Sequence, residues 1–254
     1  MSSDLLAPAC TDDEAVRAQV AYYRARAPEY DDWFYRRGEC DRGDRHTRRW
    51  RAEVEEVHAE LVAARPSGHL LELACDTGLW TERLVPFATS MTAVDASPEV
   101  IAINRRRVAP AAVDYRVADL FTWRPDRRYD FVLFGFWISH VPPSRFIAFW
   151  NMVARCLTPG GRIFFADSRR HPDSMAADPV LGEPRLTRSR RRLRDGRKFE
   201  IVKIFYKPDD LVNQLYALGW TATVHGTKNF FLYGTALTDS ANGERLEDRT
   251  RKAR

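Results

Sequence analysis

The chain has 254 residues, which is enough for one well-buried α/β core and leaves little for a second independent domain. Hydrophobic residues make up 44% of the chain and charged residues 30%, close to ordinary globular usage, and this excludes a disordered or fibrous protein. The net charge of +5 is mostly local, because residues 185–198 hold eight basic side chains and one acidic one.

Membrane and metal sites are not indicated. The longest apolar runs, such as residues 131–138, are far shorter than the roughly 20 residues of a membrane-spanning helix. The first residues lack the basic flank and apolar stretch of a secretory signal, so we expect a cytoplasmic protein with no membrane partner. The four cysteines form no C-x-x-C pair, which predicts reduced thiols and no metal site.

The first 64 residues are predicted to be mainly helical. Apolar residues recur at helical spacing over residues 12–26 and again from Trp50 onward, so two amphipathic helices precede the core. An aromatic-rich loop is expected between them, at residues 28–35. We therefore interpret residues 1–64 as an N-terminal helical segment.

Short apolar strands alternate with helical segments from His69 onward. Alternating strands and helices are typical of a parallel sheet with helices on both faces. The strands are predicted at residues 69–74, 91–95, 115–118, 129–136 and 162–166.

An Arg-rich hairpin and a closing pair of strands follow the fifth strand. Residues 186–194 and 197–205 flank Asp195-Gly196, a dipeptide favoured in type I′ turns. After a helix that starts at Pro208, two antiparallel strands are expected at residues 220–224 and 230–237. The core then spans residues 65–237, with residues 168–205 as a loop and hairpin insertion and residues 238–254 as a disordered tail.

Carboxylates stand at or near the ends of the first three strands. In an open parallel sheet, ligands bind at the carboxyl ends of the strands, where Glu72, Asp95 and Asp119 lie. A carboxylate that closes the second strand suits a hydrogen bond to two ribose hydroxyls. These positions predict a pocket for an adenosine-containing ligand.

Five segments in order resemble the class I S-adenosylmethionine-dependent methyltransferases, in particular the stand-alone bacterial enzymes that modify small molecules. The resemblance implies a Rossmann-like, doubly wound α/β fold. Its sheet would be mostly parallel and seven-stranded, with an N-terminal helical lid and a β-hairpin added before the last helix. It also implies S-adenosylmethionine as the cofactor. The segments are residues 72–78, 94–97, 118–120, 129–132 and 157–161.

The same resemblance assigns the cofactor-binding residues. It implies that Asp95 holds the ribose, that Asp119 and Leu120 bracket the adenine, and that the loop of residues 74–78 passes under the methionine portion. Aromatic residues of the lid could stabilise the sulfonium by cation–π attraction. The expected cofactor-binding residues are Tyr22, Tyr30, Glu72, Ala74, Asp76, Gly78, Trp80, Asp95, Ala96, Asp119, Leu120 and Phe136.

The first loop departs from the family pattern. Three glycines are usual there, and this chain has Ala74, Asp76 and Gly78. A carboxylate beside the ligand disfavours the pyrophosphate of a dinucleotide and favours a cation such as S-adenosylmethionine. The alternative is that Asp76 caps a helix beginning near Leu79, and both interpretations can hold together.

Acceptor binding is expected after the fourth strand and on the hairpin. His140 is the candidate general base because its ordinary pKa is near neutrality, although it could equally only pack or hydrogen-bond to the backbone. Arg188, Arg190, Arg192 and Arg194 share one face of a strand, which could bind an anionic acceptor or be a solvated face. The expected substrate-binding residues are Trp33, Trp137, His140, Arg190 and Arg192.

The sequence therefore predicts methyl transfer to a small molecule, with an oxygen, nitrogen or carbon acceptor left open and an anionic or phosphorylated metabolite as one option. No added recognition domain is visible, so no nucleic-acid partner is expected. RNA methylation and non-catalytic cofactor binding remain alternatives. An NAD-dependent oxidoreductase is disfavoured because the G-x-G-x-x-G spacing is missing. The oligomeric state is not determined by the sequence.

Overall fold

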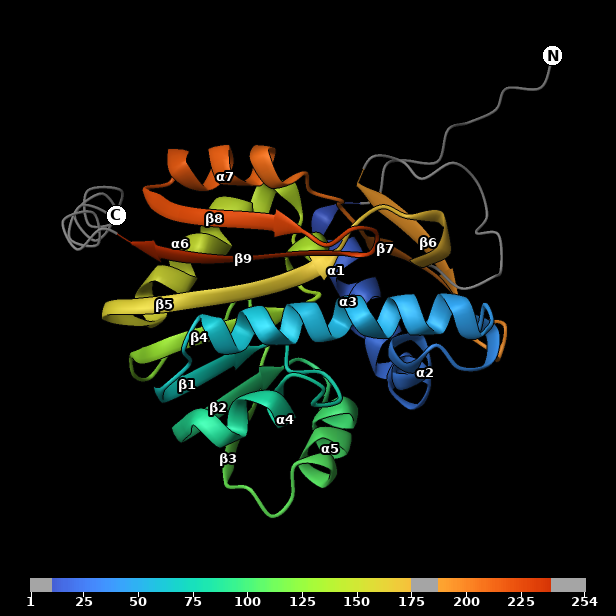
Figure 1. Cartoon of the computed structure of the whole chain (residues 1–254), viewed down its shortest axis with the longest axis horizontal. Coiled ribbons are helices and arrows are strands. Elements are labelled where there is room, and N and C mark those ends of the chain that lie inside the picture. Colours follow the sequence, from blue (N-terminus) through green and yellow to red (C-terminus); the bar gives the residue numbers. More distant parts are fainter. Residues whose placement is uncertain (1–10, 175–186, 239–254) are drawn as a thin grey trace.

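A computed structural model describes residues 11–174 and 187–238 (Figure 1). The helices are α1 (Asp12–Arg26), α2 (Tyr30–Tyr35), α3 (Asp44–Ala63), α4 (Thr81–Leu84), α5 (Pro98–Arg107), α6 (Phe146–Cys156) and α7 (Pro208–Ala217). The strands are β1 (Gly68–Leu73), β2 (Ala88–Asp95), β3 (Val113–Val117), β4 (Tyr129–Gly135), β5 (Leu157–Ser168), β6 (Arg188–Arg192), β7 (Lys198–Val202), β8 (Trp220–Gly226) and β9 (Phe231–Thr238).

Seven strands form the main sheet in the order β3-β2-β1-β4-β5-β9-β8. Strands β1 to β5 pair in parallel, whereas β9 is antiparallel to both β5 and β8. Strands β6 and β7 form a separate two-stranded sheet ahead of the last helix. The predicted Rossmann-like fold, with its seven-stranded sheet and added hairpin, is confirmed.

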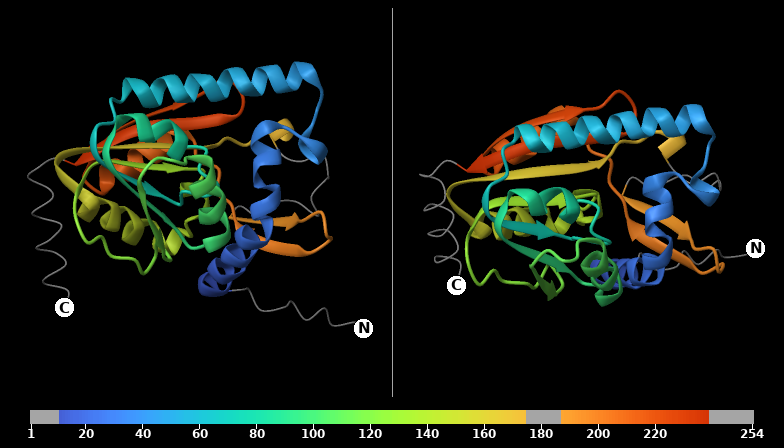
Figure 2. Two further views of the ribbon diagram at one scale, coloured as in Figure 1. Left: turned by 90° about the horizontal axis from the view of Figure 1, so that it is seen from below. Right: turned by 60° about the horizontal axis from the view of Figure 1, so that its bottom comes forward.

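Helices cover both faces of the sheet. The central strand β4 is buried on both sides, as its apolar run of residues 131–134 requires. On one face, α6 and α7 bury a stripe that includes Phe149 and Leu211. On the other face, α3 buries Trp50 and Leu61, and Figure 2 shows this long helix lying along the sheet.

The N-terminal segment contains two parts with different positions. Helix α3 packs on the sheet, while α1 and α2 lie at the end of the molecule toward which the parallel strands point (Figures 1 and 2). The hairpin β6–β7 packs on α1 through a small cluster of Tyr22, Leu193 and Ile201. We call α1 and α2 the lid, and the domain bounds drawn from the sequence stay predictions.

Two expectations about local structure are wrong. Residues 28–35 are not a loop but a short 3₁₀ turn (Ala27–Glu29) followed by α2. Acidic Asp31 and Asp32 lie in the first turn of α2, where they suit the positive end of the helix, and Tyr30 and Phe34 are buried one turn apart. Strand β5 begins at Leu157 rather than at Arg162.

Some expectations fall outside the described residues. They are the expected disordered tail, at residues 239–254, and part of the expected loop, at residues 175–184. Within the described ranges, no helix is long and apolar enough to cross a membrane.

Glu53 of α3 anchors the turn between β8 and β9. Its carboxylate accepts hydrogen bonds from the backbone N–H groups of Asn229 (3.1 Å) and Phe230 (2.8 Å) and from the hydroxyl of Thr227. These donors are largely buried, so they would be left without partners if the carboxylate were removed. The contact therefore fixes the last strand pair against α3.

We expect Glu53→Ala to lower the free energy of unfolding by about 3 kcal/mol, because several buried donors lose a charged acceptor. Urea unfolding followed by circular dichroism measures this change. Glu60→Ala is the matched control, since Glu60 is exposed on the same helix. An equal loss in both variants would contradict the anchoring role of Glu53.

Candidate active site

Every second residue of the loop after β1 is left-handed. Ala74 has φ 54°, Asp76 has φ 44° and Gly78 has φ 92°. A residue with a Cβ in this region costs roughly 1 kcal/mol, so other contacts must hold the loop. A Cβ on Gly78 would lie 2.6 Å from Oδ1 of Asn104, which explains why this glycine is retained.

Asp95, at the end of β2, is held in a fixed orientation. One carboxylate oxygen accepts from the N–H of Asp76 (3.0 Å) and the other from the N–H of Ser97 (2.9 Å). Burial raises the pKa of the Asp95 carboxyl to about 6. The loop after β1 and the turn after β2 are therefore tied together at this carboxylate.

A cavity with acidic and apolar walls opens at these strand ends. Its charged lining residues are Asp76, Asp95 and Asp119, and no lysine or arginine is among the described residues that line it. We call it the acidic cavity. A cationic ligand suits this lining, whereas a pyrophosphate would meet carboxylates without a compensating cation. The other described lining residues are Val16, Gln19, Val20, Tyr23, Tyr30, Ala74, Ala96, Ser97, Val100, Leu120, Phe121, Gly135, Phe136, Trp137 and His140.

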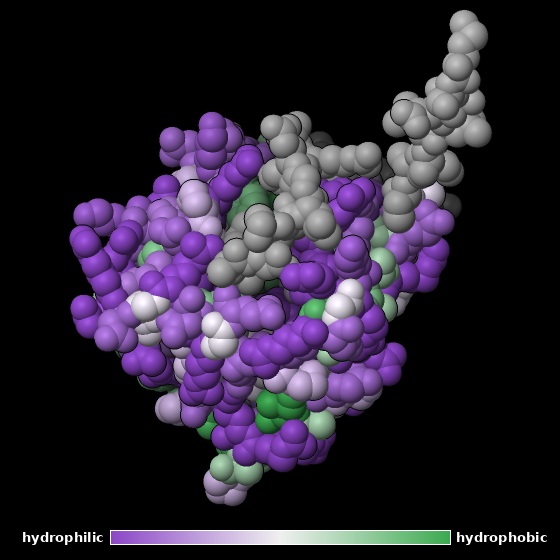
Figure 3. Space-filling view, turned by 90° about the vertical axis from the view of Figure 1, so that its right-hand side faces the viewer, coloured by the Kyte–Doolittle hydropathy of each residue, from purple (hydrophilic) through white to green (hydrophobic). Residues whose placement is uncertain are grey.

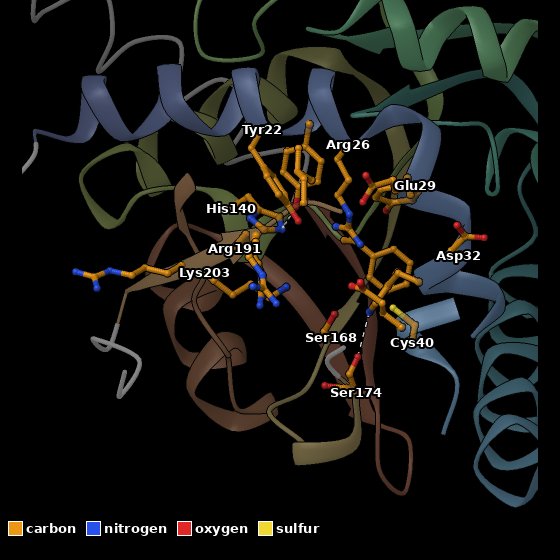
Figure 4. Close-up of a pocket in the computed structure, with 18 of the residues that line it drawn as sticks. Tyr22, Arg26, Glu29, Asp32, Cys40, His140, Ser168, Ser174, Arg191 and Lys203 are labelled. Carbon is orange, nitrogen blue, oxygen red and sulfur yellow. Dashed lines mark hydrogen bonds between the residues drawn. The ribbon is translucent and has the colours of Figure 1, made fainter. Parts of the chain in front are cut away.

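A second cavity, which we call the basic cavity, lies between the lid, the hairpin and the sheet. Figure 4 shows Arg191 and Lys203 beside His140, with Glu29 and Asp32 on the opposite side. The outer surface at this end of the molecule is mostly hydrophilic (Figure 3). The cationic side chains that line the basic cavity are Arg26, Arg190, Arg191, Arg192, Arg194 and Lys203.

Lys203 is buried at the base of the hairpin. Its Nζ donates to the hydroxyl of Ser139 (2.7 Å) and lies 3.2 Å from Oδ1 of Asp167. Burial lowers the pKa of the Lys203 ammonium, although Asp167 favours its charged form. The ion pair fastens the hairpin to the end of β5 and presents a cation to the cavity.

Arg191 is the least exposed of the hairpin arginines that line the basic cavity. Burial lowers the pKa of its guanidinium, and within the described residues no carboxylate pairs with it. Arg190 and Arg192 also line the cavity but are exposed, while Arg188 pairs with Asp12 at 3.0 Å. Arg191 is thus the hairpin side chain best placed to bind an anion. It lies on the opposite face of the strand from Arg188, Arg190 and Arg192, the face that the sequence pattern favoured.

The two cavities share part of their walls. Four residues line both cavities, and ligands in the two cavities would meet beside them. All four carry aromatic rings, so ring carbon atoms form most of the contact region. The shared residues are Tyr23, Tyr30, Phe136 and His140.

Hydrogen bonds occupy both ring nitrogens of His140. Nδ1 lies 2.7 Å from the carbonyl oxygen of Val202, which can only accept, so Nδ1 carries the proton. Nε2, 2.7 Å from the hydroxyl of Tyr23, therefore accepts from that hydroxyl. Burial, reinforced by Lys203, lowers the pKa of His140 well below its usual value, which keeps the ring neutral.

Most of the sequence-predicted residues line a cavity. The structure brings Tyr30, Ala74, Asp76, Asp95, Ala96, Asp119, Leu120, Phe136, Trp137 and His140 to the acidic cavity, and Tyr22, Trp33, Arg190 and Arg192 to the basic one.

Three predicted residues line neither of the two cavities. Glu72 accepts from the hydroxyl of Thr81 (2.6 Å), and burial raises the pKa of its carboxyl to about 8. Trp80 packs against Gly135, and Gly78 against Asn104. All three residues are buried in the interior.

Asp76 does not cap the following helix. Its carboxylate accepts from the N–H of the next residue, Thr77 (2.7 Å), and burial raises its pKa, while the hydroxyl of Tyr30 lowers it. The helix after the loop starts only at Thr81, and no side chain caps it. The capping interpretation is therefore wrong, and the carboxylate belongs to the cavity wall.

Arg26, Arg191 and Lys203 were missed by the sequence reasoning. Arg26 ends α1 and stacks over the rings of Tyr22 and Tyr30, at 5.1 Å from the Tyr30 centroid. A basic residue at the end of a helix is common, so it carried no signal. Lys203 was detectable only as an isolated cation within an otherwise apolar stretch of the second hairpin strand.

Fold and cavities together define a methyltransferase of the class I type. Residues 43–225 match the model of a family described as a methyltransferase domain, and the chain belongs to that family. The predicted class, with S-adenosylmethionine as its cofactor, is thereby confirmed.

Solved structures of relatives agree with this assignment. A structure described as a DhpI-SAM-HEP complex is 38% identical in sequence, with a TM-score of 0.73, and the match covers 88% of this chain and 97% of that one. A DhpI-SAH complex is 36% identical, with a TM-score of 0.74, and the match covers 91% of this chain and 100% of that one.

Curated relatives match over shorter stretches. A ubiquinone biosynthesis O-methyltransferase of Xanthomonas campestris pv. campestris (strain B100) is 31% identical over 135 residues, which are 50% of this chain and 55% of the relative. Nodulation protein S of Rhizobium tropici is 29% identical over 120 residues, which are 44% of this chain and 50% of the relative. The chain thus spans about half the length of the curated relatives it matches.

The buried carboxyls make stability depend on pH. Burial raises the pKa of Asp76 to about 8 and of Asp95 to about 6, above the roughly 4 of an unfolded aspartate. The folded protein without cofactor then binds more protons than the unfolded chain, so its free energy of unfolding falls as pH rises from about 4 to about 8.

Asp76→Asn should make this fall of the free energy of unfolding with pH shallower, as measured by urea unfolding at several pH values. Asp114→Asn, an exposed change on β3, should leave the slope as it is, and an unaltered slope in Asp76→Asn would contradict the assignment.

Proposed function

We propose that this protein transfers the methyl group of S-adenosylmethionine from the acidic cavity to an anionic oxygen of a small molecule in the basic cavity. The opposite charge of two adjoining cavities carries the proposal. A cationic donor and an anionic acceptor each meet the complementary lining, and their reacting ends meet at the shared aromatic wall.

In this proposal, each part of the cofactor has a partner in the acidic cavity. Asp95 would hold the ribose hydroxyls, Asp119 and Leu120 would bracket the adenine, and the loop of residues 74–78 would lie under the methionine portion. The bound cofactor supplies a methyl group already activated by its sulfonium. What the chain must add is orientation, since methyl transfer is an in-line displacement.

The acceptor would be held by the cations that line the basic cavity, of which Arg191 has no carboxylate partner among the described residues. Arg191 and Arg26 stand on the inner side of the basic cavity, and Lys203 presents its ammonium from beneath. Because these groups favour an ionised acceptor, its oxygen carries no proton that must be removed, and no general base is needed. Methyl transfer then cancels the charge of donor and acceptor together, which the apolar shared wall favours.

The names of the relatives support oxygen as the accepting atom. The Xanthomonas relative is called an O-methyltransferase, and DhpI has been solved with SAM and a second compound, HEP. For this chain, both oxygen and the anionic group are part of the proposal. The cytoplasmic location and the absence of a nucleic-acid partner also stay predictions.

His140 would act by position rather than as a base. Its Nε2 lone pair is used by the Tyr23 hydroxyl, and its Nδ1 holds the hairpin at Val202. The main-chain oxygen of His140 accepts from Gln19 of α1 at 3.2 Å. This residue thus connects the sheet to both the lid and the hairpin.

The function is tested with acceptors that share one carbon skeleton. A phosphonate, a carboxylate and a neutral alcohol are each incubated with the protein and cofactor carrying a labelled methyl group. We expect methyl esters of the anionic compounds and no labelled ether from the alcohol. Methylation of neutral or amine compounds alone would contradict the proposal.

Arg191→Gln should raise the KM for an anionic acceptor about 10-fold to 100-fold, because one charge-assisted contact is lost. The Kd for S-adenosylmethionine should stay unchanged, since Arg191 does not line the acidic cavity. Steady-state kinetics and calorimetry measure the two constants. Arg106→Gln, on the exposed side of α5, is the matched control. If the KM did not move, Arg191 would have no part in acceptor binding.

His140→Ala and Tyr23→Phe should each lower kcat by about tenfold, and the double variant should lower it no further, because both remove the same hydrogen bond. The pH profile of kcat should keep its shape in all three variants. A general base would behave differently, since loss of His140 would remove a limb of the profile that Tyr23→Phe retains.

A further inference from the structure

Asp76 occupies a position where its backbone conformation is costly. At φ 44° it is left-handed, and a glycine there would be free of this strain. Its N–H donates to Asp95, and its carbonyl oxygen accepts from the side-chain amide of Asn104 (3.2 Å). The neighbouring elements thus hold a charged side chain in a conformation that glycine adopts most easily.

The Asp76 carboxylate lies at the β1 end of the acidic cavity, beside the shared wall. The hydroxyl of Tyr30, one of the residues that line both cavities, acts on this carboxylate. Asp119 follows β3, two strands away in the sheet, or about 10 Å at the usual strand spacing. Asp76 and Asp119 therefore belong to opposite ends of the same cavity.

No lysine or arginine among the described lining residues balances Asp76 within the acidic cavity. The cation whose charge acts on its carboxyl is Arg26, which lines the basic cavity instead. A ligand group with a positive charge at the β1 end relieves the cost of the buried carboxylate, and a neutral group does not. S-adenosylmethionine and S-adenosylhomocysteine both carry an ammonium in their amino-acid portion, so the sulfonium is the charge by which they differ. The cofactor loses its sulfonium charge in the reaction, because its sulfur becomes a thioether.

We propose that Asp76 makes the acidic cavity select the positively charged S-adenosylmethionine over the neutral-sulfur product, S-adenosylhomocysteine. Asp76 is then a specificity-determining residue that favours exchange of the spent cofactor for a fresh one. The inference rests on the cofactor assigned to this cavity and is independent of the acceptor.

The test is calorimetric binding of three probes without any acceptor, at about pH 8.5. The probes are S-adenosylmethionine, S-adenosylhomocysteine and sinefungin, in which an amine-bearing carbon replaces the sulfonium. We expect Asp76→Asn to weaken the two cationic probes about tenfold and S-adenosylhomocysteine less than twofold. Asparagine tolerates the left-handed conformation as well as aspartate does, so this variant removes the charge and keeps the backbone.

Asp119→Asn is the matched control, since it removes a carboxylate from the other end of the same cavity. It should weaken all three probes by a similar factor. Asp76→Gly is a second variant that also lacks the charge but relieves the backbone, and it should show the same loss of preference as Asp76→Asn. Agreement between these two variants excludes a backbone effect.

An unchanged ratio of the two dissociation constants in Asp76→Asn and Asp76→Gly would overturn the proposal. Retained preference in only one of them would also overturn it, because both lack the charge. These outcomes are separate from failure of the proposed function, in which no anionic acceptor is methylated although the cofactor preference depends on Asp76.

Discussion

The loop after β1 depends on one fully buried amide, that of Asn104. Its Nδ2 donates to the carbonyl oxygens of Cys75 and Asp76 (both 3.2 Å) and to the hydroxyl of Thr81 (2.7 Å), while its Oδ1 accepts from the hydroxyl of Tyr115 (2.7 Å). Loop carbonyls in left-handed turns cannot join a regular ladder, so they need such a partner. With the loop fixed, Asp95 is fixed as well, and the acidic cavity has a defined wall.

The arrangement of charge around the site follows from the chain's topology. The strand ends supply the carboxylates of the acidic cavity, because three consecutive strands each end at or just before an aspartate. The lid and the hairpin supply the cations of the basic cavity, and both are additions to the sheet. Donor and acceptor cavities therefore come from different parts of the sequence, which can vary separately.

The sequence was sufficient for the features that follow from strand periodicity and strand ends. Asp95 and Asp119 could be placed because a parallel sheet brings the carboxyl ends of its strands together. Arg191 could not, because its orientation depends on how the hairpin packs on α1, and the alternation of arginines suggested the opposite face. Lys203 was equally hidden, since its role depends on the long-range ion pair with Asp167.

Helix α2 is another feature that the sequence pattern does not predict. Its six residues are too short and too aromatic to produce a clear helical pattern, and the helix exists because Tyr30 and Phe34 are buried against the core. Tertiary packing, rather than local preference, decides the conformation there.

The small apolar cluster of Tyr22, Leu193 and Ile201 has a consequence for the energetics of binding. Helix α1 borders both cavities and is joined to the hairpin by this cluster, so a displacement of α1 changes both binding spaces together. The affinities for the two ligands are then thermodynamically linked, and by reciprocity each ligand must alter the affinity for the other by the same factor.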